Sequence, residues 1–356
     1  MTTLDVPIPL DPSGIRAAVD NLLHEFLDEQ ERISSVPELT LFTGLLRDLL
    51  TAGGKRVRPV LCVTGWQAIS RELPPRMVFR MAASLELFHV FALIHDDIMD
   101  NSALRRGLPT AHRMLAARNG HHPQAEALGT NAAILLGDLT LGWSYDLLYL
   151  GSPAEEQAAT PWTTLNAMRT ETLVGQYLDL ASTGSRSPEA ELAWKVICYK
   201  TAKYTFERPL HLGASLANAD EHQLQALSAY ALPLGEAFQL RDDLLGVFGN
   251  PGETGKSALD DLREGKQTVL ITTAYERATP AQAAYLRAHL GSPQLGPDEA
   301  EEIRAILVET GAVEAVEEMI TVRHKRALES LDAAPLQPVA TDVLRELAIT
   351  SVARVA

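Results

Sequence analysis

The chain has 356 residues, 46% of them hydrophobic, and a formal net charge of −15 at pH 7. This length and composition suffice to bury a large core, so we expect a single domain over residues 1–356 with a flexible tail over about residues 1–12. The acidic balance argues against a nucleic-acid-binding surface, so any phosphate ligand has to be captured by local clusters of basic residues.

Cys62 and Cys198 are the only cysteines. They are too few for a disulfide framework or a zinc site, and their apolar neighbours predict reduced residues in the core. The first forty residues lack the basic start and continuous apolar block of a signal peptide, and no run approaches the roughly 18 apolar residues of a spanning helix. We therefore expect a cytoplasmic protein without stable membrane insertion.

Apolar residues recur three and four positions apart along most of the chain, which is typical of helices, whereas strand-like alternation is scarce. The pattern predicts an all-α protein. The expected helices cover residues 14–34, 56–70, 77–101, 124–150, 160–182, 189–202, 221–247, 268–290 and 297–331.

The segment Leu85–Asp100 is an apolar helical stretch that ends in the carboxylates Asp96, Asp97 and Asp100. Asp96 and Asp100 share a helix face, whereas Asp97 points about 100° away. Acids on one face repel each other at a helix end that already disfavours anions, and a bound divalent cation would reverse both effects. Carboxylate oxygens suit Mg²⁺, which commonly bridges to substrate phosphates. A solvated helix end is the alternative for this segment taken alone.

The segment Gly235–Gly246 repeats this arrangement, because a second apolar helical stretch ends in Asp242 and Asp243. Two such helix ends could face each other across a cavity. The recurrence favours a two-sided metal site over two unrelated solvated helix ends.

Basic residues lie where a phosphate would need them. The segment Gly53–Pro59 places three cations at the start of a predicted helix, where free backbone N–H groups and the helix dipole also attract anions. Arg105 and Arg106 follow the first acid cluster within a few residues. We interpret each basic cluster as one phosphate site, with surface solubility as the alternative for each. The three cations are Lys55, Arg56 and Arg58.

The stretch from Gly249 to Ser257 looks like a phosphate-binding P-loop but lacks its first glycine. Asn250 stands five positions before Gly255, where a P-loop has glycine, and no strand precedes it. We predict instead a flexible, charged loop over the second acid pair, from which Lys256 and Lys266 reach phosphate.

Together these motifs resemble those of the head-to-tail trans-prenyl diphosphate synthases, the polyprenyl synthetase family, in the family's order and across nearly the whole chain. The resemblance implies a single-domain helical bundle of the isoprenoid synthase type around a central active-site cavity. It also implies three Mg²⁺ ions, a homodimer, and isopentenyl diphosphate and an allylic diphosphate as substrates, the allylic partner being dimethylallyl, geranyl or farnesyl diphosphate.

The resemblance gives roles to the basic residues. In the family, residues matching Lys55, Arg58 and His89 hold isopentenyl diphosphate. Arg105 and Arg106 match the pair that grips the allylic and the homoallylic diphosphate, respectively.

The resemblance also gives roles around the acids. The magnesium ligands would be Asp96, Asp100 and Asp242, with Asp97 and Asp243 completing the two catalytic acid pairs. Lys200 and Thr201 match the family's Lys-Thr step, and Gln239 matches its glutamine one turn before the second acid motif; all three would position the allylic diphosphate and shelter the cation.

One position departs from the family pattern. The second acid motif is commonly Asp-Asp-x-x-Asp, and its last position here is Gly246. Because the first aspartate matters most for direct ligation, we expect activity to survive. We predict that Asp96→Ala and Asp242→Ala each abolish condensation and that Gly246→Asp changes the rate modestly.

The implied mechanism is ionisation, condensation and elimination. Magnesium and the basic residues stabilise the leaving diphosphate, the isopentenyl double bond attacks the allylic cation, and a proton is lost. The released diphosphate serves as the base, so no dedicated catalytic histidine is required.

Product length is inferred from the residues before Asp96. Phe91 and Ala92 lie five and four positions before it, and Phe88 lies eight before it, all toward the expected chain pocket. In the family, a bulky residue followed by a small one at these positions resembles short-chain synthases that make C20, so we expect geranylgeranyl diphosphate. Ordinary core packing is the alternative for both phenylalanines.

Other functions stay open at this point. The product could be farnesyl diphosphate or a polyprenyl diphosphate of C25 and longer. A class I terpene cyclase would also begin with an Asp-rich motif, but it would carry a different second metal motif and would not need Lys55, Arg58 and His89. A non-catalytic regulatory subunit of a prenyl synthase would be expected to lose acid motifs, and only Gly246 points that way.

Overall fold

A computed structural model of the chain describes residues 11–149, 160–184, 189–250 and 258–353. They group into two compact units, each built from separate stretches of the chain. Unit 1 comprises Met1–Pro161, Pro209–Ala219 and Gln337–Val343, and unit 2 comprises Trp162–Arg208, Asp220–Leu336 and Leu344–Ala356. The single-domain organisation stays a prediction. Of the expected N-terminal tail, residues 1–10 lie outside the described residues, whereas Asp11 caps the first helix through its side chain.

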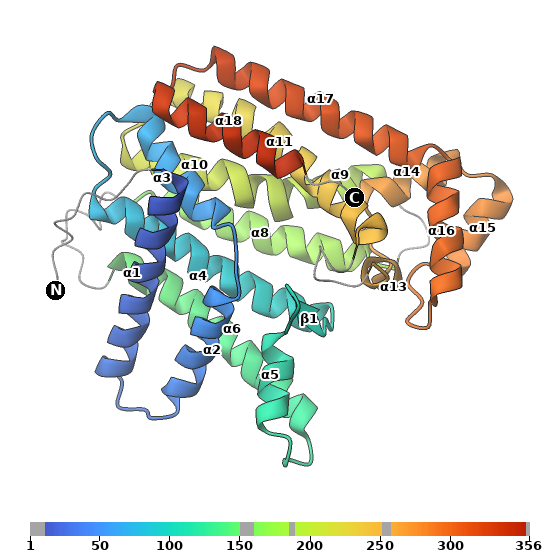
Figure 1. Ribbon diagram of the computed structural model, residues 1–356, viewed down its shortest axis with the longest axis horizontal. Helices are drawn as coiled ribbons and strands as arrows, with labels where there is room; N and C mark the ends of the chain where they lie inside the picture. The colour runs from blue at the N-terminus through green and yellow to red at the C-terminus, as the bar shows by residue number, and fades with distance from the viewer. Residues whose placement is uncertain (1–10, 150–159, 185–188, 251–257, 354–356) are drawn as a thin grey trace. The chain divides into compact units, whose positions relative to one another are not determined.

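Unit 1 is built on α4, whose long apolar sequence is buried along most of its length and packs side by side with α6 (Figure 1). The helices α1 and α2 form a hairpin beside them (Figure 1). The elements of this part of the chain are α1 (Pro12–Ile33), α2 (Leu39–Thr51), α3 (Val57–Ile69), α4 (Arg76–Met99), β1 (Leu104–Arg105), β2 (Leu108–Pro109), α5 (Ala111–Arg118), α6 (Ala125–Tyr149) and α10 (Arg208–Leu216).

Unit 2 is built on α11, which packs against α17 and against the π-helix η1 (Figure 1). Its elements are α8 (Trp162–Ser182), α9 (Ala190–Val196), η1 (Ile197–Glu207), α11 (Glu221–Phe248), α13 (Asp260–Glu264), α14 (Val269–Arg277), α15 (Pro280–His289), α16 (Pro297–Glu309) and α17 (Ala312–Ala333). The last helix of the described residues is α18 (Pro338–Val352).

The all-α expectation is confirmed, but three of the expected helices are divided. The helix expected over 189–202 changes to a π-helix at Ile197. The helix expected over 268–290 stops before Thr279, which caps a new helix with Pro280 in its first turn. The helix expected over 297–331 breaks at Gly311, whose φ of +67° lies in the left-handed region.

Several elements were not expected from the sequence. The helix α2 contains threonine and glycine, which lower helix propensity, but the burial of Leu45, Leu46 and Leu50 stabilises it. The helices α5 and α10 and the short hairpin β1–β2 were also missed, because each is too short for a clear periodic signal.

By length and composition alone, α4 qualifies as a membrane-spanning helix, contrary to the expectation that no segment would come close. In the structure, 83% of its most apolar window is buried. The apolar residues of α4 therefore form the core of unit 1.

The helices α3 and α10 cross so closely that their backbones touch. A Cβ atom on Gly65 would lie 2.3 Å from the carbonyl oxygen of Leu210, and one on Gly213 would lie 1.7 Å from that of Cys62. Only glycine fits at either position.

We predict that Gly213→Ala lowers the free energy of unfolding by about 1–3 kcal/mol, because the added methyl group forces α3 and α10 apart. Urea denaturation measures this. The matched control is Gly142→Ala in α6, where nothing lies within 4 Å of the added atom, so it should stabilise the helix by about 0.5–1 kcal/mol. Equal stability of Gly213→Ala and the wild type would contradict the close crossing.

Candidate active site

The first aspartate pair ends α4, as expected from the sequence. Asp100 is the C-cap residue, and its backbone N–H donates to the carbonyl oxygen of Asp96. The two carboxylates of the pair differ in exposure, at 19% for the Asp96 side chain and 4% for that of Asp97. Arg105 donates to both, at 2.7 Å from Nε to Asp97 and 3.0 Å from a terminal nitrogen to Asp96. The more exposed carboxylate of the pair is thus Asp96.

Arg105 and Arg106 are presented by the β1–β2 hairpin. Its two-residue loop is Arg106-Gly107, and both residues have positive φ, +54° and +78°, as a type I′ turn requires. This turn sends the two arginines to different partners: Arg105 reaches the aspartate pair, whereas Arg106 donates to the carbonyl oxygen of Gly53. A bulky residue at positive φ is uncommon and points to a constraint other than stability.

The basic segment Gly53–Pro59 turns into α3 at Arg56, which has a φ of +48°. Lys55 before it is exposed, and Arg58 lies half-buried in the first turn of α3. The Arg56 side chain is 7% exposed and points inward to Glu86 and Asp20. The three cations of this segment therefore do not share one environment.

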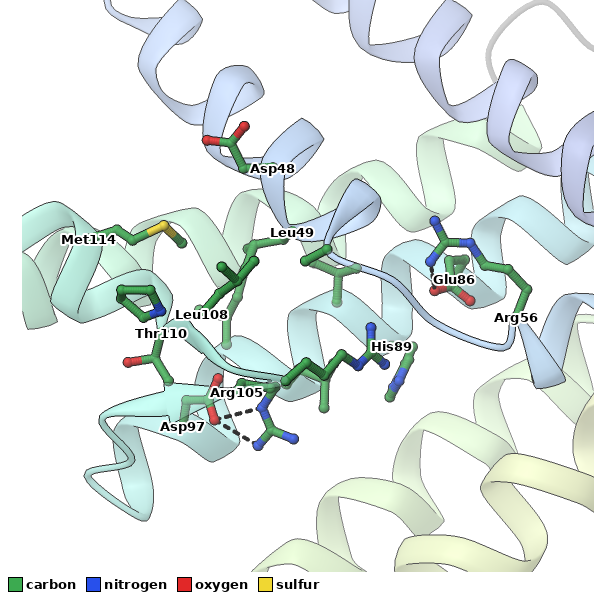
Figure 2. A pocket seen from close by; sticks show the side chains of 16 residues that line it. Asp48, Leu49, Arg56, Glu86, His89, Asp97, Arg105, Leu108, Thr110 and Met114 are labelled. Carbon is green, nitrogen blue, oxygen red and sulfur yellow. Dashed lines mark hydrogen bonds and ion pairs between the residues drawn. The ribbon is translucent and has the colours of Figure 1, made fainter. Parts of the chain in front are cut away.

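Only part of these residues lines a cavity in unit 1 (Figure 2), because Lys55, Arg58, Asp96 and Asp100 are not among its lining residues. The α4 residues that line it follow helical spacing and form one stripe: Glu86, His89, Val90, Leu93, Ile94 and Asp97. Arg56, Arg105 and Arg106 line it as well. Burial lowers the pKa of His89 well below its usual value, and the positive charges of the neighbouring arginines lower it further, so this imidazole is neutral at neutral pH.

In unit 2, the residues of the second motif form a hydrogen-bonded chain. Thr201 Oγ1 donates to Gln239 Oε1 at 2.6 Å, and Gln239 Nε2 donates to Asp243 Oδ1 at 2.8 Å. Gly235 allows this contact, because a Cβ there would lie 2.5 Å from the Cα of Ala202 in η1. Lys200, next to Thr201, donates to Asp179 of α8 at 2.6 Å. The π-helix η1 thus delivers Lys200 and Thr201, and such helices are frequent at functional sites.

The second aspartate pair is also divided by burial. Asp243 is buried, and desolvation raises its pKa to about 8, with Asp261, Asp242 and Asp179 adding to the rise and the Gln239 hydrogen bond opposing it. Asp242 is half-buried and thus the more exposed of the two. Each pair therefore has one buried carboxylate and one, Asp96 or Asp242, that is more exposed.

The departure at Gly246 has a steric reason. A Cβ atom on Gly246 would lie 1.9 Å from Oδ2 of Asp261, at the start of α13. The carboxylate of Asp261 therefore occupies the space next to α11 that a side chain at position 246 would take. Lys266 lies 3.6 Å from Asp261 and 2.9 Å from Glu264. Lys256, the other expected phosphate-binding lysine, lies outside the described residues.

The residues expected to set product length lie on α4. Phe88 and Phe91 are buried and meet edge to face with ring centroids 5.4 Å apart, and Phe91 meets His95 in the same way at 4.9 Å. Ala92 is half-buried. Neither phenylalanine lines the cavity of Figure 2, so their role as a pocket floor stays a prediction.

Sequence reasoning gave no separate role to three residues that contact the site: Glu86, Asp179 and Asp261. Glu86 could have been found as an acid inside an apolar helix, three positions before His89. Asp179 and Asp261 carry no such signal, because each reaches its partner across a helix packing that the sequence does not specify.

Comparison with known proteins gives one consistent result. A family model described as Polyprenyl synthetase matches residues 40–307. Geranylfarnesyl diphosphate synthase of Aeropyrum pernix is 30% identical over 82% of this chain and 87% of its own length. Geranylgeranyl diphosphate synthase of Saccharolobus solfataricus is 32% identical over 73% and 74%, respectively. A solved structure of geranylgeranyl pyrophosphate synthase from Corynebacterium glutamicum, complexed with isoprenyl diphosphate and magnesium, is 40% identical with a TM-score of 0.91, covering 97% of this chain and 100% of that one.

We predict that Gly246→Asp lowers the free energy of unfolding by about 1–3 kcal/mol, because the new side chain displaces Asp261 and adds an anion beside Asp242 and Asp243. The modest rate effect expected from the sequence stays a separate prediction. Thermal unfolding measures it, with Gly142→Asp as the control, since that exposed glycine has nothing within 4 Å. Equal losses of stability in the two variants would show that Asp261 moves aside at no cost in free energy.

Proposed function

The chain belongs to the polyprenyl synthetase family of prenyltransferases, and we propose that it joins isopentenyl diphosphate to an allylic diphosphate with the help of Mg²⁺, giving geranylgeranyl diphosphate. The observation that carries this proposal is the division within each aspartate pair. Asp97 and Asp243 are buried in protein contacts, whereas Asp96 and Asp242 are more open. Each pair thus has one carboxylate that is more exposed, and we assign this one to the metal.

The donor set fits magnesium. Asp96, Asp100 and Asp242 supply hard oxygen atoms, and among the residues that the structure describes no group of three or more His, Cys, Asp or Glu side chains is arranged to hold a metal ion alone. Mg²⁺ usually binds through one or two carboxylates together with waters and substrate phosphates. When bound, three such ions would neutralise charge that develops on the leaving diphosphate.

The basic residues of unit 1 would hold the homoallylic substrate. Lys55 is exposed and Arg58 lies in the first turn of α3, where helix N–H groups add to the attraction. Arg106 lies against the same loop through Gly53. His89 lines the cavity and would donate a hydrogen bond to the diphosphate.

The remaining polar residues would hold the allylic substrate. Arg105 would exchange part of its contact with Asp96 for the diphosphate, which releases that carboxylate. Lys200 and Lys266 lie on unit 2 with acidic partners of their own and would contribute positive charge, as would Lys256. Thr201 and Gln239 present oxygen atoms from a fixed hydrogen-bonded pair, which would shelter an allylic cation.

The proposed reaction needs no base other than the released diphosphate. The allylic carbon–oxygen bond breaks with its electron pair going to the diphosphate. The double bond of isopentenyl diphosphate forms the new carbon–carbon bond, and the proton lost from the adjacent carbon goes to the released diphosphate. The chain's own residues orient the two substrates and stabilise the leaving group.

We also propose that the enzyme acts as a cytoplasmic homodimer. On α8, exposed apolar side chains recur at helical spacing and form one face: Leu173, Val174, Tyr177 and Leu180. On α6, Leu135 and Ile134 are exposed as well. The exposed apolar face of α8 favours a protein partner, and light scattering measures the mass in solution.

Incubation of the purified protein with Mg²⁺, isopentenyl diphosphate and each allylic primer, followed by sizing of the products, tests the proposal. A C20 product supports it. A C15 product or a product of C25 and longer would replace the product assignment. A cyclised hydrocarbon, or no product in the absence of a partner protein, would overturn the proposed activity.

We predict that Asp96→Ala and Asp242→Ala each lower the condensation rate by at least about 100-fold. Each variant removes a carboxylate that would hold Mg²⁺ against the reacting diphosphate. Asp332→Ala is the control. Its carboxylate pairs with Arg345 on the surface, so its rate should stay within about twofold of the wild type. A fully active Asp242→Ala variant would rule out Asp242 as a magnesium ligand.

We predict that Phe91→Ala shifts the product toward longer chains, because removal of the ring deepens the expected pocket. Chromatography of the products measures this. Phe79→Ala, in the first turn of α4, removes an equally buried ring and costs a similar 3–5 kcal/mol or so of stability, but should leave the product length unchanged. An unchanged distribution in Phe91→Ala would assign Phe91 to core packing.

A further inference from the structure

Arg56 belongs to the basic segment Gly53–Pro59, yet its side chain points into unit 1. Its guanidinium donates from Nε to Asp20 of α1 at 2.8 Å and from one terminal nitrogen to Glu86 of α4 at 2.8 Å. The other terminal nitrogen donates to the carbonyl oxygen of Leu50 in α2 at 2.6 Å. All three nitrogens are therefore engaged by protein acceptors from three helices.

Arg56 also forms the turn that begins α3. Its φ of +48° lies in the left-handed region, which is unfavourable for a residue with a long side chain. The three hydrogen bonds of the side chain offset this cost. Lys55 precedes this residue and Arg58 follows it by two positions, so the turn fixes the direction in which both side chains leave the backbone.

Glu86 links this turn to the rest of the cavity. It lies three positions before His89 on the cavity-lining stripe of α4 and faces Arg56 (Figure 2). It also attracts Arg106 electrostatically. Gly54 lies between the two guanidinium groups, since a Cβ there would be 3.0 Å from Nη1 of Arg106 and 3.2 Å from Nη1 of Arg56. One buried carboxylate thus allows two cations to flank the same loop.

We propose that Arg56 and Glu86 are positioning residues for the homoallylic diphosphate. Their ion pair holds the loop over 53–56 and the neighbouring Arg106 in place before the substrate arrives, while Arg56 itself does not bind phosphate. Such preorganisation lowers the ordering cost of binding. The inference rests on the proposed function, because it names what orients the isopentenyl diphosphate subsite.

Arg56→Lys and Glu86→Gln test this. Lysine keeps the charge but lacks the planar fork that reaches three acceptors, so Arg56→Lys should not hold the loop in place. Each variant should raise the KM for isopentenyl diphosphate at least about tenfold, with the KM for the allylic substrate unchanged. Calorimetric titration with isopentenyl diphosphate alone should show the same loss of affinity without turnover. The control is Arg47→Lys, whose partners Asp28 and His24 lie outside the cavity lining.

The double variant Arg56→Met/Glu86→Leu separates positioning from stability. Each single variant disturbs the ion pair and should melt below the wild type. Removal of both charges should bring the melting temperature back to the wild-type value, but the affinity for isopentenyl diphosphate should stay weak. A wild-type KM in Arg56→Lys or in Glu86→Gln, an equal rise of both KM values, or full recovery of affinity in the double variant would each overturn the inference. Failure of the wild-type protein to bind isopentenyl diphosphate would instead overturn the proposed function.

Discussion

Arg105 holds both carboxylates of the Asp96–Asp97 pair with one guanidinium group. Without it, two adjacent anions would stand at the C-terminal end of α4, where the helix dipole already disfavours negative charge. The other acids of the candidate site meet the same constraint with partners of their own, as Asp179 does with Lys200. In a chain with a net charge of −15, a diphosphate can approach only where basic residues such as Lys55, Arg58 and Arg106, or a bound cation, supply positive charge.

This constraint explains why the two members of each aspartate pair differ. A carboxylate that is buried must be hydrogen-bonded, and Asp97 and Asp243 are bonded to Arg105 and Gln239, respectively. Their neighbours Asp96 and Asp242 are more exposed. In the proposed reaction, a diphosphate that draws Arg105 away from Asp96 would free that carboxylate for magnesium, so that substrate and metal help each other to bind.

The sequence predicted the ends of α4 and α11 to within two residues, because long apolar periodicity near paired acids is a strong local signal, although α11 continues past Asp243 to Phe248. It also predicted the basic segment before α3, but not that Arg56 turns inward, because that depends on Asp20 and Glu86 from other helices. The β1–β2 hairpin was missed, since Arg106-Gly107 is a weak turn signal beside Asn-Gly or Asp-Gly. Gly246 looked like a lost ligand until the position of Asp261 was known.

In the proposed site, basic residues bind isopentenyl diphosphate, whereas Mg²⁺ helps to bind the allylic diphosphate. Calorimetric titration with and without a chelator tests this difference most directly. Isopentenyl diphosphate should bind with similar affinity in Mg²⁺ and in EDTA, because in the proposed site Lys55, Arg58, His89 and Arg106 would bind it without a metal ion. An inert allylic analogue, farnesyl thiolodiphosphate, should lose at least about 100-fold in affinity when Mg²⁺ is removed. Equal binding of the allylic analogue in both buffers would contradict the proposed role of Asp96, Asp100 and Asp242 as magnesium ligands.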